Sequence, residues 1–252
     1  HSNSEFNKAI EFFGKSLAIR LETLGPDHPE VAQSYNNLGA THHFKAEYDK
    51  TIEYFGKSLA INLKTHGPDH PDVGVIYGNL GAAHFRNGGY ESAIECHEKS
   101  LAIQLKSLKP GHPSLATSYR NLGYAHEKKR GYDKAVEYQE QALIIDLKAL
   151  GPEHPGVARS YNTLGSLYDA KGSVDKAIEH HEKCLEILLK VHGTRHPHVA
   201  SSYNNLALIH LKKGDKAKAR EHLLKARSIL MKTLGPGSIK TKNVQYSLDQ
   251  LE

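Results

Sequence analysis

The sequence predicts an all-α protein in which about twelve helices stack as antiparallel pairs into a solenoid, and two observations carry this prediction. The first is a set of five histidines that stand 42 residues apart: His28, His70, His112, His154 and His196. A period of this size is the signature of a repeat array. The second is that apolar residues recur within each period at helical spacing, as in Val31, Tyr35 and Leu38. Because one repeat cannot bury its apolar face alone, the repeats are expected to stack on one another.

Each period is expected to contain two helices, called helix A and helix B here. Helix A begins at a proline, which suits the first helical position because its missing N–H is not needed there. These prolines are Pro29, Pro71, Pro113, Pro155 and Pro197. Helix A ends at polar and glycine residues such as Lys171-Gly172, where glycine permits the turn. Helix B follows, as in residues 48–65, and ends at a glycine in every period except the one at Lys109.

The predicted domain organisation is a single repeat array over residues 1–252. Residues 1–25 form a helix B without its helix A, and residues 236–252 form a degenerate helix A. Five helix pairs lie between them, at 26–67, 68–109, 110–151, 152–193 and 194–235. The last block departs from the pattern at Gln245 and Asp249, as terminal repeats often do because one of their faces meets water. Small residues in the columns of Gly39 and Ala93 are expected where helices approach closely.

Composition and motifs exclude several classes of function. No apolar run reaches about 18 residues and no charged-then-apolar leader opens the chain, so neither a membrane span nor a secretory signal is expected. Cys96 and Cys184 suggest no disulfide framework, so we expect a cytoplasmic protein. With 33 basic and 28 acidic residues and no basic stripe, nucleic-acid binding is not expected.

Catalytic signatures are also missing, and no enzyme activity and no cofactor are expected. Neither His-Glu-x-x-His nor Gly-x-Ser-x-Gly occurs. The triplets Gly14-Lys15-Ser16 and Gly56-Lys57-Ser58 resemble the end of a phosphate-binding loop. Both fall inside predicted helices, whose backbone N–H groups are already bonded and cannot hold phosphate.

The motif Tyr35-Asn36-Asn37-Leu38-Gly39, followed by Tyr48 and Ile52, resembles the tetratricopeptide repeat. Its 42-residue form, with Leu-Gly-Pro-Asp-His-Pro before helix A, is similar to the repeats of kinesin light chain and nephrocystin-3. The resemblance covers nearly the whole chain. It implies a right-handed superhelix whose concave surface is lined by the A helices and binds extended peptides or partner helices without catalysis. In kinesin light chain this groove takes short acidic cargo segments.

The resemblance places three columns of helix A on the concave surface. The first column is Asn37, Asn79, Asn121, Thr163 and Asn205, and the second is Asn36, Gly78, Arg120, Asn162 and Asn204. The third is Gln33, Val75, Thr117, Arg159 and Ser201, four residues before the first and therefore on the same helix face. Arg86 and Lys128 are expected lower on the A helices.

These residue types suit recognition of a peptide. An asparagine side chain both donates and accepts hydrogen bonds, so a column of them can pair with an extended backbone. An arginine fits a carboxylate with two hydrogen bonds, which makes an acidic segment a candidate ligand. The predicted partner-binding residues are therefore Asn36, Asn37, Asn79, Arg86, Arg120, Asn121, Lys128, Arg159, Asn162, Asn204 and Asn205. In the alternative interpretation, the asparagines bridge neighbouring helices and the arginines are solvated.

The chain contains 18 histidines, but we expect no metal site. His180 and Cys184 stand one helical turn apart, which is a spacing that metal ligands use. However, Cys184 occupies a column of small residues, where cysteine behaves as a small apolar side chain. His42, His84, His126 and His210 share a column with Tyr168 and are interpreted as packing aromatics.

The leading hypothesis is a monomeric scaffold or adaptor that binds a protein or peptide in the groove. In one alternative, the array is the sensor or regulatory region of a larger signalling protein, because the chain opens in the middle of a repeat. In another, chains associate head to tail, since the first helix lacks a helix A and the last lacks a helix B.

Overall fold

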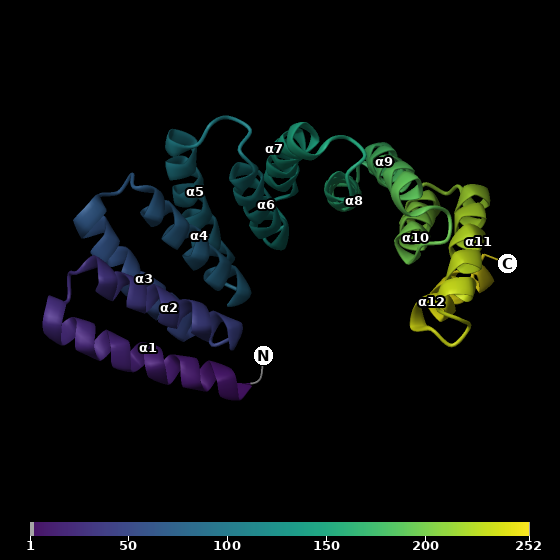
Figure 1. Cartoon of the computed structure of the whole chain (residues 1–252). Coiled ribbons are helices and arrows are strands. Elements are labelled where there is room, and N and C mark those ends of the chain that lie inside the picture. Colours follow the sequence, from purple (N-terminus) through teal and green to yellow (C-terminus); the bar gives the residue numbers. More distant parts are fainter. Residues whose placement is uncertain (1–2, 252) are drawn as a thin grey trace. The chain divides into compact units, whose positions relative to one another are not determined.

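The computed structural model describes residues 3–251, and these residues form twelve α-helices joined by short turns (Figure 1). This confirms the predicted all-α repeat fold. The predicted terminal ranges also include residues 1, 2 and 252, which lie outside the described residues.

Contacts divide the chain into two compact units, one ending at Arg130 and the other beginning at Gly131. Unit 1 contains α1 (Asn3–Leu24), α2 (Pro29–Phe44), α3 (Tyr48–His66), α4 (Pro71–Arg86), α5 (Tyr90–Ser107) and α6 (Pro113–Lys128). Unit 2 contains α7 (Tyr132–Leu150), α8 (Pro155–Ala170), α9 (Val174–His192), α10 (Pro197–Lys212), α11 (Lys216–Thr233) and α12 (Ile239–Asp249). Within each unit, every helix packs on the next along the chain, and the most extensive packing joins each helix A to its own helix B.

The five repeating histidines cap the A helices, a role that sequence reasoning missed. In each case Nδ1 accepts a hydrogen bond from the backbone N–H of the second helical residue. The donors are Glu30 to His28, Asp72 to His70 and Ser114 to His112, each at 3.2 Å, Gly156 to His154 at 2.9 Å and His198 to His196 at 3.1 Å. The following proline occupies the first helical position, as predicted. Accepting this bond requires an unprotonated Nδ1.

Glycines on the A helices let the B helices approach closely. A Cβ added to Gly39 would lie 2.7 Å from the ring of Phe55 on α3. Added to Gly81, it would lie 2.7 Å from the ring of His97 on α5. In unit 2, Gly165 meets His181 on α9 in the same way, at 2.8 Å. The glycine column of helix A is therefore the surface on which helix B of the same repeat packs.

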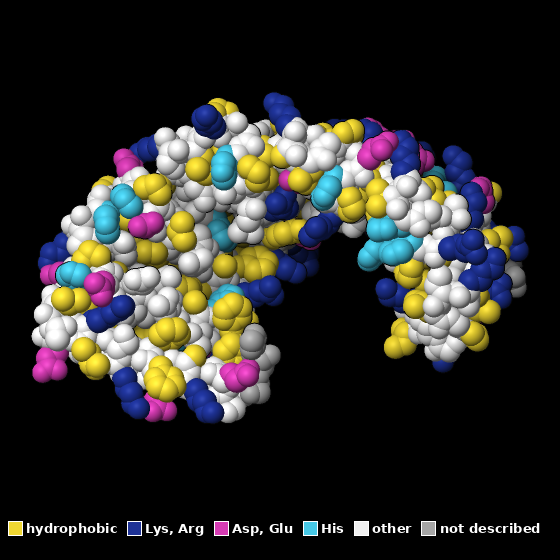
Figure 2. Space-filling model, viewed as in Figure 1, with side chains coloured by type: hydrophobic (Ala, Val, Ile, Leu, Met, Phe, Trp, Pro, Cys, Tyr) yellow, Lys and Arg dark blue, Asp and Glu magenta, His cyan; other side chains and the backbone are white. Residues whose placement is uncertain are grey.

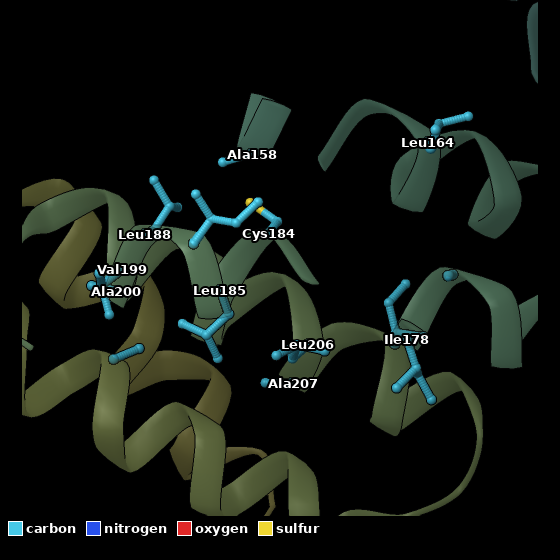
Figure 3. Packing of buried hydrophobic residues seen from close by; sticks show 14 of the residues in the cluster. Ala158, Leu164, Ile178, Cys184, Leu185, Leu188, Val199, Ala200, Leu206 and Ala207 are labelled. Atoms are coloured by element: carbon cyan, nitrogen blue, oxygen red, sulfur yellow. The ribbon is translucent and has the colours of Figure 1, made fainter. Parts of the chain in front are cut away.

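The core of unit 2 is a continuous apolar cluster drawn from α7 to α12. Figure 3 shows part of it, with Cys184, Leu185 and Leu188 of α9 beside Leu206 and Ala207 of α10. Both helix types contribute to this layer, with Leu164 and Leu206 from A helices and Leu185 and Leu223 from B helices, and the side chains interdigitate as in a close-packed core.

Two histidines occupy a core position that holds Phe55, Gln139 or Leu223 in other repeats. His97 and His181 are each only 2% exposed, at the position that Phe55 and Leu223 fill in their repeats. Burial lowers the pKa of His97 to about 4. Burial likewise lowers the pKa of His181 to about 4, although nearby Asp169 opposes the shift. Both imidazoles are therefore neutral in the folded chain near pH 7.

The turn between helix A and helix B requires one residue with a left-handed backbone conformation (positive φ). In two of the turns this residue is not glycine. Gly88, Gly172 and Gly214 have φ values of 84°, 81° and 84°. Ala46 and Arg130 adopt a φ of 58° at the equivalent positions. An L side chain in this conformation costs about 1–2 kcal/mol.

Ala46→Gly is therefore expected to raise the free energy of unfolding by about 0.5–1 kcal/mol, because relief of strain exceeds the added entropy of the unfolded chain. Gly88→Ala should lower it by a similar amount, since a Cβ there meets no atom within 4 Å and only the backbone is affected. Urea denaturation of the two variants beside wild type measures both changes. Equal stability of Ala46→Gly and wild type would contradict this account of the turn.

Candidate functional site

A cavity of about 490 Å³ lies in unit 2 across α8, α9 and α10. Four residues from the predicted columns of helix A line it: Arg159, Asn162, Ser201 and Asn205. Ala158, Cys184 and Leu188 supply apolar surface in the same cavity. The arrangement combines an apolar surface with polar groups on one helix face, as binding cavities commonly do.

The two asparagines of this cavity are hydrogen-bonded to each other. Asn205 Nδ2 donates to Asn162 Oδ1 at 3.0 Å, which joins α10 to α8. The alternative interpretation, in which asparagines bridge neighbouring helices, is thus confirmed for this pair. One amide hydrogen of Asn205 and the amide group of Asn162 are not used in this bond, so the pair keeps hydrogen-bonding capacity towards the cavity.

Histidines gather at one end of the cavity, near the N-terminus of α10, and Figure 2 shows a patch of histidine side chains there. The ring centroids of His192 and His196 lie 4.1 Å apart in a stacked arrangement, and His198 lies 4.9 Å from His196. Burial and the two neighbouring histidines lower the pKa of His196. Three imidazole rings therefore lie together at this end of the cavity.

A second cavity, of about 360 Å³, shares the lining residue Asn205 with the first. Lys212 Nζ lies 2.5 Å from Asp169 Oδ2 at its edge. Asp169 Oδ1 and His181 Nδ1 are both buried in this cavity, and neither has a hydrogen-bond partner within residues 3–251. Leu208 adds an exposed apolar side chain. These two cavities, which both involve α8, α9 and α10, are together called the groove of unit 2.

Unit 1 has a comparable cavity of about 460 Å³ across α2, α3 and α4. Gln33, Asn36 and Val75 from the predicted columns line it, together with Asn62 of α3. Asn36 Oδ1 is buried and has no hydrogen-bond partner among the residues that the structure describes. This cavity therefore also offers an acceptor for a ligand N–H.

The other predicted residues lie on the A helices but do not line these three cavities. They are Asn37, Asn79, Arg86, Arg120, Asn121, Lys128 and Asn204. Arg120 Nη2 donates to Thr117 Oγ1 at 3.3 Å, within α6. Arg86 helps to lower the pKa of His43, after the larger effect of burial. Their role in binding stays a prediction.

His180 and Cys184, which are spaced like metal ligands on a helix, do not form a metal site together. His180 Nδ1 donates to the carbonyl of Lys176 at 2.9 Å, and its ring packs 5.0 Å from that of Tyr168. Cys184 is buried, with Sγ 3.6 Å from Ser202 Oγ, and burial raises the pKa of its thiol. Over residues 3–251, no group of three or more His, Cys, Asp or Glu is arranged to hold a metal ion.

No helix within residues 3–251 combines the length and apolar character that crossing a membrane requires. Stacked helix pairs with small residues at the contacts and cavities across the A helices define an α-helical repeat protein of the solenoid class. The chain belongs to the tetratricopeptide repeat family, whose model matches residues 1–64, 42–106, 72–146, 114–188 and 170–232. Repeats of this family generally serve as scaffolds for protein–protein interaction.

Solved structures agree with this assignment. A putative kinesin light chain of Podosopora anserina with nearly identical repeats is 31% identical, with a TM-score of 0.72 over 82% of this chain and 98% of that one. BtubC from P. vanneervenii is 23% identical, with a TM-score of 0.71 over 91% and 92% of the two chains. YrrB, a tetratricopeptide repeat protein with an unusual peptide-binding site, is 18% identical, with a TM-score of 0.61 over 94% and 100%. The last two show the fold alone. Comparison with curated protein sequences gives no match.

Proposed function

We propose that the chain is a non-catalytic cytoplasmic scaffold or adaptor that binds an extended peptide segment, acidic in character, across its A helices. The observation that carries this proposal is the cavity in which Arg159, Asn162 and Asn205 come together over an apolar surface. The free thiols of Cys96 and Cys184 agree with a reducing compartment. The chain is proposed to act as a monomer.

The groove of unit 2 offers each element that an extended peptide needs. The Asn162–Asn205 pair can bond backbone N–H and C=O groups whatever the peptide side chains are. Leu188, which lines the cavity, can contact an apolar side chain of the ligand. Arg159 is exposed, and its guanidinium can bind a carboxylate with two parallel hydrogen bonds. The similarity to a putative kinesin light chain supports the same class of ligand.

Binding of acidic, basic and neutral peptides of equal length, measured at low and moderate salt, tests this proposal. The acidic peptides are expected to bind best, and their affinity should fall as salt rises. Arg159→Glu combined with Asn205→Ala should weaken binding at least about tenfold, because a charge-assisted hydrogen bond contributes about 1.5–3 kcal/mol. Helical content should change little because Arg159 is exposed, while loss of the Asn205–Asn162 hydrogen bond should lower stability by only about 0.5–1.5 kcal/mol.

Arg220→Glu is the matched control. Arg220 is exposed on α11 outside the cavities of unit 2, and this substitution changes the net charge by the same amount. It should leave peptide affinity close to that of wild type. Wild-type affinity in the double variant, or no binding by any of the three peptide classes, would refute the proposal.

A further inference from the structure

The cavity of about 460 Å³ in unit 1 and the cavity of about 490 Å³ in unit 2 occupy the same place in their repeats. Each is lined by a helix A, the helix B that follows it and the next helix A, which are α2, α3 and α4 in unit 1 and α8, α9 and α10 in unit 2. Most of the lining positions correspond when the chain is shifted by three periods of 42 residues, as Asn36 and Asn162 do. The two cavities can therefore be compared one side chain at a time.

The side chains at these positions differ in charge and polarity. The corresponding residues, with unit 1 first, are Gln33 and Arg159, Ser58 and Cys184, Asn62 and Leu188, and Asp72 and His198. Among the described residues that line the cavity of unit 1, the fully ionised side chains near pH 7 are those of Glu30 and Asp72, both acidic. The cavity of unit 2 has Arg159 instead, and its buried positions are more apolar. The two cavities therefore favour ligand groups of opposite charge.

Two buried oxygen atoms at the cavity of unit 1 have no hydrogen-bond partner within residues 3–251. They are Asn36 Oδ1 and Ser58 Oγ. Ser58 is only 1% exposed, whereas its counterpart Ser100 on α5 donates to the carbonyl oxygen of Gly74 at 2.7 Å. An unpaired buried oxygen is costly, so a group with N–H donors that enters this cavity gains two acceptors.

Asp72 adds a negative charge that no lysine or arginine of the described chain neutralises. Its side chain is 66% exposed, and the ion-pair contact given by its carboxylate is to His70 Nδ1, at 3.7 Å. That nitrogen accepts a hydrogen bond from the backbone N–H of Asp72 and is therefore unprotonated. Glu30, in contrast, pairs with Arg20 at 3.3 Å. Asp72 is thus the carboxylate that is available to a cationic ligand.

We propose that the cavity of unit 1 binds the side chain of a lysine in an extended partner segment. An ammonium group has three donors and no acceptor, which suits the oxygens of Asn36 and Ser58. The Asp72 carboxylate supplies the opposite charge at the exposed side of the cavity. The alkyl stem of the lysine lies along Val75, which is 58% exposed, since such stems commonly cover apolar surface. This site is separate from the cavity that carries the acidic-peptide proposal, and neither proposal depends on the other.

The capped peptide acetyl-Ala-Gln-Lys-Gln-Ala-amide tests the proposal by titration into the ¹⁵N-labelled full chain. The side-chain amide resonances of Asn36 and Asn62 should shift, the shifts should saturate, and the affinity should fall as salt rises. The same peptide with acetyl-lysine in place of lysine keeps the stem but loses the charge. It should bind at least about tenfold more weakly, as should the peptide with glutamate at this position, because hydrogen bonds from a charged donor are the strong ones.

Ser58→Ala removes one acceptor and should weaken binding of the lysine peptide at least about fivefold. Its melting temperature should equal or exceed that of wild type. Ser58 Oγ has no partner within residues 3–251 to lose, and Ala142 fills the same position in α7 with 0% exposure. Reduced affinity without reduced stability separates a role in binding from a role in folding.

Asp72→Asn should weaken binding of the lysine peptide by about two- to fivefold and reduce its salt dependence, because an exposed ion pair is lost. Asp69→Asn is the matched control. Asp69 is exposed, pairs with Lys106 at 2.7 Å and does not line the cavity, and its substitution changes the net charge by the same amount. It should leave the affinity close to that of wild type.

Three results would overturn the proposal. The first is the absence of saturable shifts at Asn36 and Asn62 with the lysine peptide, and the second is equally tight binding of the acetyl-lysine peptide. The third is wild-type affinity in both Ser58→Ala and Asp72→Asn, or an equal loss in Asp69→Asn and Asp72→Asn, which would indicate general charge attraction without a site in this cavity.

Discussion

Gly81→Leu is expected to unfold the α4–α5 pair of unit 1 or to lower the free energy of unfolding by about 3 kcal/mol, the upper end of the range for overpacked cores. A Cβ at this position would lie 2.7 Å from two atoms of the His97 ring, and His97 is itself buried. The remaining atoms of leucine would have to displace that ring. The melting temperature should fall by about 10 °C for a protein of this size.

Gly56→Leu is the matched control for this variant. Gly56 lies inside α3, and a Cβ there meets no atom within 4 Å. Leucine has a higher helix propensity than glycine, so this variant should be about 0.5–1 kcal/mol more stable than wild type. Thermal and urea denaturation of both variants measure the contrast. Wild-type stability of Gly81→Leu would show that the helix-pair packing described here is wrong.

Acid is expected to destabilise the folded chain between about pH 6.5 and pH 4, with His97 and His181 as the principal source. Burial lowers the pKa of each to about 4, from an ordinary value of 6.5. The unfolded chain therefore takes up protons at a higher pH than the folded chain does. The contribution to stability is complete above about pH 6.5 and is lost as the pH falls towards 4, by about 3 kcal/mol for each histidine.

Replacement of each histidine by the residue that another repeat uses provides the test. His97→Phe and His181→Leu should each reduce the pH dependence of the unfolding free energy by about 1.4 kcal/mol per pH unit within this window. Urea denaturation at several pH values from 7 to 5 measures the slope. His43, His84, His210 and His222 also have lowered pKa values through burial, so the slope of the double variant should be smaller than in wild type but not zero.

The reciprocal variant, Phe55→His, should introduce the same dependence at a position that lacks it, because Phe55 is equally buried against Gly39. An unchanged slope in His97→Phe together with His181→Leu would contradict the assignment.

Most of the fold could be predicted because a few residues have the same role in every repeat. A proline at the first helical position marks the start of helix A whatever surrounds it, and α2, α4, α6, α8 and α10 all begin there. The histidine caps were missed although the signal was present, since each histidine directly precedes such a proline. Histidine is not among the usual N-cap residues, so position was the better guide than residue type.

The core positions of helix B and the details of the groove are harder to predict from the sequence. Phe55, His97, His181 and Leu223 share a position but little chemistry, so the column carries no pattern that identifies it. The sequence placed Arg159, Asn162 and Asn205 on helix A, and they line one cavity. The hydrogen bond between the two asparagines depends on the rotation from one helix pair to the next, which side-chain packing determines and residue spacing does not.

The histidine cap has a consequence for how such a gene can change. Each 42-residue period carries its own cap, its own helix start and its own left-handed turn, and its helices pack mainly on their neighbours along the chain. Recombination between two periods can therefore duplicate or delete a whole period. Each helix A then still has its N-cap histidine, and each turn between helix A and helix B still has its left-handed residue. Because each cavity is lined by residues of two adjacent repeats, such a change also alters which residues face a ligand at the new junction.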